Sequence, residues 1–228
     1  MASHIQNTIS KEFDAFSFNY TEDMKNVVPH YLKLMSCFGA DLPQDFKPKQ
    51  ILDLGVGNGN STAAVMPVSP DAHYTLLDAS AEMLSMSKER FKDYNTTVVQ
   101  SYFSDYTYVT STFDYIIAGF SLHHCDTQEK QQLFSSIYKA LQLGGIFSFS
   151  DLCINKTDIE HPILVQEWKD FILGHGGIEK WHWLEEHYNA FDRPNRFEDQ
   201  KKWLLAAGFS KVDVYWRAGF WMNVRAFK

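Results

Sequence analysis

The 228 residues are 45% hydrophobic and 15% aromatic, carry a net charge of −7 and include three cysteines. This composition allows one domain with a full apolar core, and no apolar run approaches the roughly 20 residues that span a bilayer. The acidic balance argues against a nucleic-acid partner, and the odd, widely spaced cysteines argue against a disulfide framework or a zinc ribbon. We therefore expect a cytoplasmic protein that binds neither nucleic acid nor a membrane.

The first 45 residues are expected to form N-terminal helices, and the chain then alternates short β-branched runs with segments of helical periodicity. This alternation is typical of an α/β protein with a mostly parallel sheet. The last of the helices is the best defined, because Asp126 and Glu129 form a capping box and Gly144-Gly145 is expected to end it. We expect strands at 49–54, 72–78, 96–100, 113–118 and 145–151, with helices at 59–66, 80–92 and 127–141 between them.

The character of the sequence changes after the fifth expected strand. Residues 155–195 contain one or two helices crowded with aromatic side chains, and we expect them to form a small helical cap inserted into the fold. The amphipathic segment RFEDQKKWLLAAGF then ends at Gly208, and two β-rich runs follow at 210–216 and 219–227. Because only two residues join these runs, they must form a hairpin, and the last strand is antiparallel to its neighbour. The whole chain, 1–228, is expected to be a single domain.

The segment ILDLGVGNGNST, residues 51–62, runs from the first expected strand into a glycine-rich loop and then a helix. Such a loop points backbone N–H groups at a nucleotide-like ligand. The dinucleotide fingerprint needs a glycine where this loop has Asn60, and a Walker-type phosphate loop needs a lysine that this loop lacks. Residues 50–87 contain no Lys or Arg. The pattern therefore favours a ligand without phosphate groups.

Two carboxylates flank the glycine loop. Asp53 directly precedes it and suits a cationic group, and Asp78 ends the next strand. A carboxylate at the second position accepts hydrogen bonds from a ribose diol. S-adenosylmethionine offers ribose hydroxyls, an ammonium and a sulfonium, and it has no phosphate. It is therefore the cofactor that we expect.

Five motifs occur in the order and spacing of a known family: the glycine motif DLGVGNG, LLDAS, FDYIIAGFSLHH, ALQLGGIFSFSD and WLLAAGF. Over residues 10–155 and 196–228 the chain thus resembles the class I S-adenosylmethionine-dependent methyltransferases. The resemblance implies a Rossmann-like α/β fold, with a doubly wound, seven-stranded, mostly parallel sheet and an antiparallel last strand. The cofactor-binding residues that it implies are Tyr20, Asp53, Gly55, Gly57, Gly59, Asp78, Ala79, Met83 and Asp105.

Two of these residues have a second interpretation. Tyr20 lies in EFDAFSFNYTEDM, which resembles the family segment that covers the methionine part of the cofactor, but a tyrosine there also suits an amphipathic anchor of its own helix. Asp105 follows the third expected strand, where the family often has an acid that binds the adenine amino group. The surrounding polar run 101–112 equally suits a solvated turn aspartate.

Methyl transfer from a sulfonium is an in-line displacement, which needs an aligned acceptor, exclusion of water and in some cases removal of a proton. His123 and His124 follow the fourth expected strand, at the rim that faces the methyl group in this family. Imidazole has a suitable pKa for a base, so these two residues are the catalytic candidates, and hydrogen bonding within the loop is the alternative. We favour His123 for proximity to the cofactor.

The cap is where we expect the choice of substrate to be made. Trp168 and Trp183 are the candidates for contact with a flat or apolar acceptor, although cap aromatics also serve as ordinary core. No metal site is expected, because HWLEEH places His182 and His187 five residues apart and is not the HExxH pattern.

The function that we expect is methyl transfer from S-adenosylmethionine to a small aromatic or apolar molecule. The sequence is also compatible with a homodimer. The first alternative is a tRNA-modification enzyme, acting on RNA or through carboxy-S-adenosylmethionine. ALQLGGIFSFSD and the ending AGFSKVDVYWRAGFWMNVRAFK resemble carboxy-S-adenosylmethionine synthase. That enzyme has an arginine in the helix before the final AGF, where this chain has Trp203. The second alternative is a catalytically silent cofactor-binding module.

Overall fold

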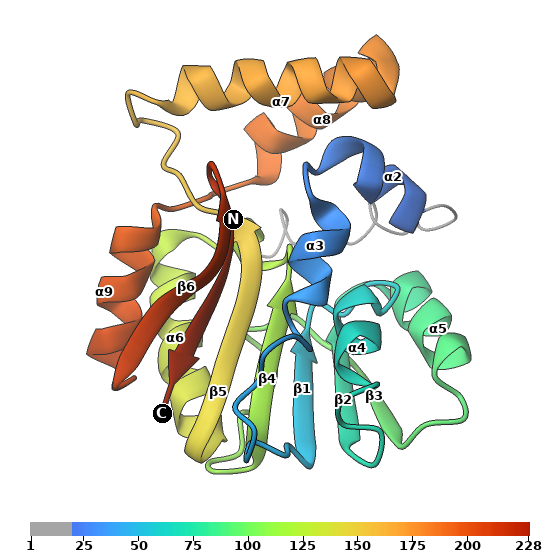
Figure 1. Cartoon of the computed structure of the whole chain (residues 1–228), viewed down its shortest axis with the longest axis vertical. Coiled ribbons are helices and arrows are strands. Elements are labelled where there is room, and N and C mark those ends of the chain that lie inside the picture. Colours follow the sequence, from blue (N-terminus) through green and yellow to red (C-terminus); the bar gives the residue numbers. More distant parts are fainter. Residues whose placement is uncertain (1–19) are drawn as a thin grey trace.

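The computed structural model describes residues 20–228, which contain one seven-stranded sheet (Figure 1). The strands are β1 (Gln50–Leu54), β2 (His73–Asp78), β3 (Thr96–Gln100), β4 (Phe113–Gly119), β5 (Leu141–Leu152), β6 (Lys211–Ala218) and β7 (Trp221–Phe227). Their order across the sheet is β3-β2-β1-β4-β5-β7-β6. Strands β1 to β5 pair in parallel, whereas β7 pairs antiparallel with both β5 and β6. The expected mostly parallel sheet with an antiparallel last strand is confirmed.

Helices cover both faces of this sheet (Figure 1). The helices are α2 (Tyr20–Val27), α3 (Tyr31–Ser36), α4 (Asn60–Val65), α5 (Ala81–Arg90), the short 3-10 helix η2 (Leu122–His124), α6 (Thr127–Ala140), α7 (His161–His175), α8 (Gly177–Phe191) and α9 (Phe197–Ala207). One apolar core joins the sheet to α3, α4 and α5, and a second joins it to α6 and α9. Burial on both faces explains why the central strands are almost continuously apolar.

The capping box of α6 is confirmed: the Asp126 carboxylate accepts from the Glu129 backbone N–H, and the Glu129 carboxylate accepts from the Asp126 N–H. The predicted end of this helix, residue 141, lies within one residue of the observed end, but the prediction that Gly144-Gly145 stops the helix is wrong. Helix α6 ends at Ala140, and β5 begins at the next residue, so Gly144 and Gly145 lie inside the strand. There they accommodate an irregularity in the pairing of β4 with β5, and Gly144 has a φ of 80°. Glycine tolerates this conformation, so the pair bends a strand and does not stop a helix.

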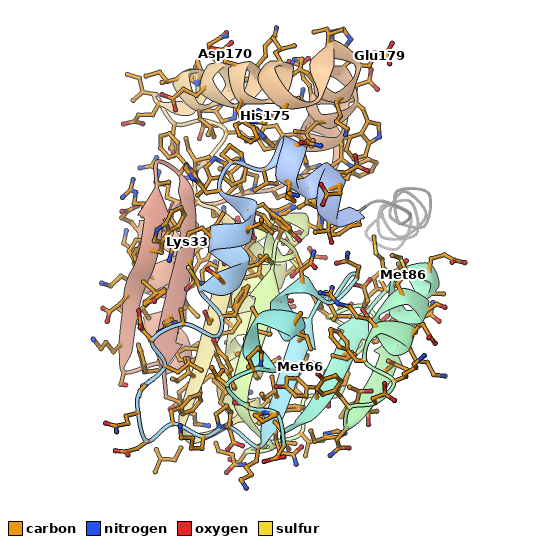
Figure 2. All side chains as sticks on the ribbon, turned by 45° about the vertical axis from the view of Figure 1, so that its right-hand side comes forward. Lys33, Met66, Met86, Asp170, His175 and Glu179 are labelled. Atoms are coloured by element: carbon orange, nitrogen blue, oxygen red, sulfur yellow. The ribbon has the colours of Figure 1, made fainter. Side chains whose placement is uncertain are left out.

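Helices α7 and α8 lie across the carboxyl ends of the parallel strands, at the top of Figure 1. In α7 the buried residues Leu164, Trp168 and Ile172 recur every four positions and so form one apolar stripe facing the body. Asp170 and Glu179 lie on the outer surface of this helix pair (Figure 2). Residues 161–191 therefore cover the end of the sheet where the glycine loop lies. None of the helices in residues 20–228 has the length and apolar character needed to cross a membrane.

Candidate functional site

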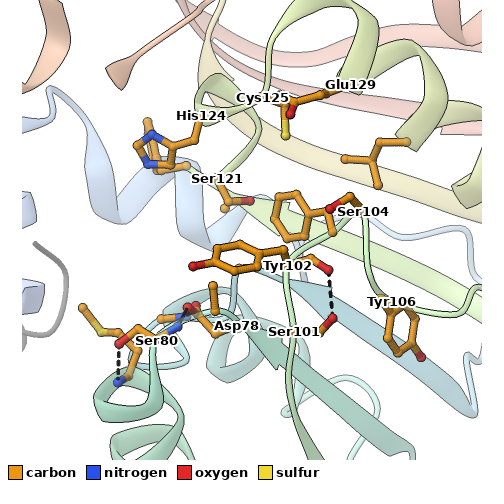
Figure 3. A pocket seen from close by; sticks show the side chains of 18 of the residues that line it. Asp78, Ser80, Ser101, Tyr102, Ser104, Tyr106, Ser121, His124, Cys125 and Glu129 are labelled. Carbon is orange, nitrogen blue, oxygen red and sulfur yellow. Dashed lines mark hydrogen bonds between the residues drawn. The ribbon is translucent and has the colours of Figure 1, made fainter. Parts of the chain in front are cut away.

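A cavity of about 300 Å³ lies at the carboxyl ends of β1, β2 and β4. It brings together six of the predicted cofactor residues: Tyr20, Gly55, Gly57, Asp78, Ala79 and Met83. Asp78 and Ser80 lie at one side of the cavity and His124 at the other (Figure 3). The apolar part of the wall includes Phe103, Phe120 and Leu133. This is the crevice in which open α/β sheets bind nucleotides.

Hydrogen bonds join the glycine loop to the end of β2. The carboxylate of Asp78 accepts from the backbone N–H of Gly57 at 2.8 Å through one oxygen and from the N–H of Ser80 at 2.9 Å through the other. The N–H groups of Gly55 and Val56 both donate to the carbonyl of Leu77. The orientation of Asp78 is therefore fixed by the backbone that surrounds the cavity.

The three glycines of the loop have positive φ angles of 71°, 53° and 87°, which favour glycine over other residues. Their surroundings differ. A Cβ at Gly55 would lie 2.5 Å from the Cβ of Ser121, and one at Gly59 would lie 2.3 Å from the ring of Phe91. Among the atoms of residues 20–228, the nearest to a Cβ at Gly57 would be in the Tyr20 ring, at 3.9 Å. Gly57 thus faces the cavity, whereas Gly59 lies outside it and permits close packing of α4 against α5.

Asp53 is fully buried behind the loop and does not line the cavity. One of its carboxylate oxygens accepts hydrogen bonds from the hydroxyls of Ser61 and Thr62, at 2.5 and 2.7 Å. The other oxygen has no hydrogen-bond partner among the described residues. Burial raises the pKa of Asp53 to about 6 despite the two hydroxyl donors. Any effect of Asp53 on a ligand therefore acts through the loop and through its charge.

Asp105 also lies outside the cavity. It is exposed, and its carboxylate accepts from the hydroxyl of the adjacent Ser104. The wall on this side is formed by the preceding residues of the same segment, including Ser101 and Tyr102. The polar run therefore contributes to the site through residues that sequence reasoning did not select. A tyrosine two residues after the third strand was the signal that could have found them.

A second cavity, of about 60 Å³, lies between the first cavity and the α7–α8 cap. It shares Tyr20, Phe120 and His124 with the first cavity. Both predicted cap residues line it, but in different ways. Trp168 is only 5% exposed, and its indole N–H donates to the backbone carbonyl of Val27. Trp183 is 36% exposed and stacks on His187, with 5.4 Å between the ring centroids.

The two rim histidines belong to a largely buried cluster beneath the cap. His123 Nδ1 lies 2.6 Å from Asp151 Oδ1, and the backbone N–H of His123 donates to the other oxygen of Asp151. Asp192 Oδ1 lies 3.3 Å from His124 Nδ1, 3.5 Å from His187 Nε2 and 3.8 Å from His123 Nε2. His124 lines the first cavity and His123 does not. The preference for His123 on grounds of proximity is therefore wrong, because the bond to Asp151 holds its ring in the second cavity.

The two histidines differ in pKa and therefore in charge. Burial disfavours the charged form of His123, but the carboxylates of Asp151 and Asp192 outweigh it and raise the His123 pKa to about 9. Burial and the neighbouring His123 lower the pKa of His124 to about 4. At pH 7 the pair thus holds one charged and one neutral imidazole. Sequence reasoning missed Asp151 and Asp192. Asp151 could have been found as the polar residue near the end of the fifth strand, but no local signal indicates Asp192.

Comparisons with known proteins agree with this geometry. A family model described as a methyltransferase domain matches residues 51–145. The carboxy-S-adenosyl-L-methionine synthase of Campylobacter concisus is 25% identical, and the match covers 95% of this chain and 94% of that protein. Phosphoethanolamine N-methyltransferase 2 of Caenorhabditis elegans is 36% identical over 118 residues, which are 50% of this chain and 25% of that protein.

Solved structures share the fold. A candidate O-methyltransferase from Nostoc punctiforme PCC 73102 aligns with a TM-score of 0.69 at 19% identity, over 95% of this chain and 60% of that one. An S-adenosylmethionine-dependent methyltransferase from Mesorhizobium loti aligns with a TM-score of 0.60 at 18% identity, over 86% of this chain and 95% of that one. With its sheet order, its glycine loop and these relatives, the chain belongs to the class I methyltransferases, enzymes whose cofactor is S-adenosyl-L-methionine.

Proposed function

We propose that this methyltransferase transfers the methyl group to a small molecule with an aromatic or apolar body, bound in the second cavity. The observation that carries this proposal is that three residues, Tyr20, Phe120 and His124, line both cavities. An acceptor beneath the cap would therefore meet a cofactor held by the glycine loop. Trp168, Trp183 and Trp221 supply flat apolar walls, and such walls favour a flat or apolar ligand.

On the cofactor side, we propose that Asp78 holds the ribose hydroxyls while Gly55 and Gly57 bring the backbone close to the ligand. Ala79 and Met83 line the cavity beyond Asp78 and would contact the adenine, and Tyr20 would cover the methionine part. We assign Asp53 an indirect role, because its buried charge lies behind the loop. On the acceptor side, His124 is neutral at pH 7 and so has a nitrogen lone pair with which to accept a proton.

The Asp78→Asn variant is expected to bind S-adenosylmethionine at least tenfold more weakly than the wild type. The amide keeps the shape of the carboxylate, but its NH₂ would face the N–H of Gly57 or of Ser80, both of which now donate to Asp78. An unsatisfied donor costs about 1–3 kcal/mol, and the ribose loses an acceptor as well. Calorimetry with S-adenosylmethionine, S-adenosylhomocysteine and NAD measures this. Tight NAD binding by the wild type, with no response to the other two, would contradict the assignment of the whole cavity.

The two cap tryptophans are expected to respond differently to substitution. Trp183→Ala should keep the fold, because the ring is partly exposed, and should raise KM for the acceptor. Trp168→Ala should lose about 3–5 kcal/mol of unfolding free energy, because the buried indole anchors α7 to the end of α2.

Formation of S-adenosylhomocysteine with a panel of phenols, thiols and amines identifies an acceptor and its KM. Trp203→Ala is the control, since Trp203 lies outside both cavities. An unchanged KM in Trp183→Ala would remove the cap from substrate choice.

The second candidate is an enzyme of carboxy-S-adenosylmethionine chemistry, which the relative from Campylobacter concisus favours. Against it, the described residues that line the two cavities include no Lys or Arg that would bind the extra carboxylate. The net charge of −7 also disfavours tRNA as a direct partner. A gel shift with tRNA at increasing salt tests this alternative, and retained binding at physiological salt would support it.

Cys37, Cys125 and Cys153 are unpaired, which suits the cytoplasmic location that we propose.

A further inference from the structure

Three imidazoles and one carboxylate from separate parts of the chain converge beneath the cap. His123 and His124 lie in η2 at the end of the sheet, His187 lies on α8, and Asp192 directly follows α8. The ligating atoms of His123, His124 and Asp192 all lie within 4.8 Å of one another. His187 Nε2 lies 3.5 Å from the same oxygen of Asp192 that the other two imidazoles approach.

The spacing of this cluster is unusual for hydrogen bonds. The three imidazole nitrogens lie 3.3, 3.5 and 3.8 Å from Asp192 Oδ1, whereas N–H···O bonds span about 2.7–3.2 Å. This oxygen is buried and has no hydrogen-bond partner among residues 20–228. In contrast, the ligand atoms of a tetrahedral zinc ion, each at about 2.0–2.2 Å from the metal, are about 3.3–3.5 Å apart. The distances from Asp192 Oδ1 to His124 and to His187 fall in this range, and the distance to His123 is a few tenths of an ångström longer.

A second contact prepares His123 for metal binding. Its Nδ1 is bonded to Asp151 Oδ1 at 2.6 Å, which leaves Nε2 directed to the side of Asp192. Metal-binding histidines usually bond a carboxylate through the other ring nitrogen in this way, because the bond fixes the tautomer and the ring orientation. Binding of an ion through Nε2 would release the proton that His123 carries there in the metal-free protein.

We propose that His123, His124 and Asp192 bind one divalent transition-metal ion, such as zinc. All three line the second cavity, where His187 and Trp183 are their neighbours. Two imidazoles and one carboxylate are the protein ligands of many catalytic metal sites, which keep a further position open for the substrate. The same ion would join the cap to the body, because η2 follows β4 whereas Asp192 follows α8. The backbone N–H of Arg193 already donates to the carbonyl of His123 at 2.6 Å across this junction.

This inference, where it concerns the acceptor, rests on the proposed function. An ion at this position favours an acceptor with a hydroxyl, thiol or amine that occupies the open position. The ion would lower the pKa of the bound group, so that its proton leaves to water. His124, whose lone pair then binds the ion, would accept a proton only in the metal-free protein. The acceptor atom then forms its bond to the methyl carbon as the bond from that carbon to sulfur breaks. The sulfur keeps the electron pair, and S-adenosylhomocysteine leaves.

Titration of Co²⁺ and Zn²⁺ into the chelator-treated full-length protein, free of any affinity tag, tests the metal site directly. We expect one equivalent of Co²⁺ to give the intense visible bands of a four- or five-coordinate ion, and Zn²⁺ to displace it. Asp192→Asn and His124→Ala should lose this binding, and Asp151→Asn should weaken it by about 10–100-fold. His182→Ala is the matched control, since His182 is an exposed histidine on the same helix as His187, outside the cluster.

Each outcome has one meaning. Absence of stoichiometric binding by the wild type would overturn the site, and so would binding that survives in Asp192→Asn or disappears in His182→Ala. Circular dichroism and cooperative thermal unfolding show whether a variant is folded, and Zn²⁺ should raise the unfolding temperature of the wild type and of His182→Ala only. Calorimetry with S-adenosylmethionine in metal-free buffer tests the proposed function separately. Cofactor binding without Zn²⁺ binding therefore contradicts only the metal site.

Discussion

The Gly59→Ala variant is expected to lose about 2 to 5 kcal/mol of unfolding free energy, through backbone strain and overpacking together. Gly59 has a φ of 87°, and a Cβ added there would lie 2.3 Å from the Phe91 ring. Phe91 is 3% exposed and packed in the core, so its ring cannot move aside without disturbing α5. Urea unfolding followed by circular dichroism measures the loss.

Gly57→Ala is the matched control for this prediction. Gly57 also has a positive φ, of 53°, but within the described part of the chain an added Cβ would approach only Tyr20, at 3.9 Å. We expect a loss of about 1–2 kcal/mol from the backbone alone, together with a large loss of S-adenosylmethionine affinity because the methyl group projects into the cavity. Equal destabilisation by the two substitutions, or wild-type cofactor affinity in Gly57→Ala, would contradict the division of roles between the two glycines.

The second large effect concerns pH. Burial raises the pKa of Asp53 to about 6 from its ordinary 3.8, so the folded protein binds this proton more tightly than the unfolded chain does. The free energy of unfolding therefore falls as the pH rises from about 4 to about 6. Ionised Asp53 destabilises the fold above pH 6, and the penalty disappears as the pH falls below about 4. At one pKa unit per 1.36 kcal/mol, the full penalty is about 3 kcal/mol.

The Asp53→Asn variant removes this titration. The difference in unfolding free energy between the variant and the wild type should therefore shift by about 3 kcal/mol in favour of the variant between pH 3 and pH 8. Measuring both proteins at each pH cancels the titration of every other group. A difference that is flat with pH would show that Asp53 ionises normally. With the cofactor placed as proposed, S-adenosylmethionine affinity of the wild type also falls below pH 6, and that of the variant does not.

Much of the sheet was predictable because its signals are local. Strand β3 has the predicted bounds and β1, β2 and β4 differ from them by one residue at one end, since β-branched runs and the turn residues between them specify each strand separately. The glycine loop was also predictable, because Asn60 and the missing lysine exclude the two phosphate-binding loops. The start of β5 was not predictable. There the ladder with β4 is irregular, and a glycine pair in such a strand looks, in one dimension, the same as the end of a helix.

By itself, the sequence determined the fold class, the cofactor and the position of its loop, because strand period, glycine spacing and the carboxylate of Asp78 are read from short stretches. The tertiary structure alone decided which residues share the site. It moved Asp53 and Asp105 out of the cavity and brought His124 into it. It also brought His123 and His124 to Asp192, more than 60 positions along the chain, because the Trp168 stripe of α7 packs the cap onto the body. Contacts of this kind depend on how distant segments pack, which no local pattern records.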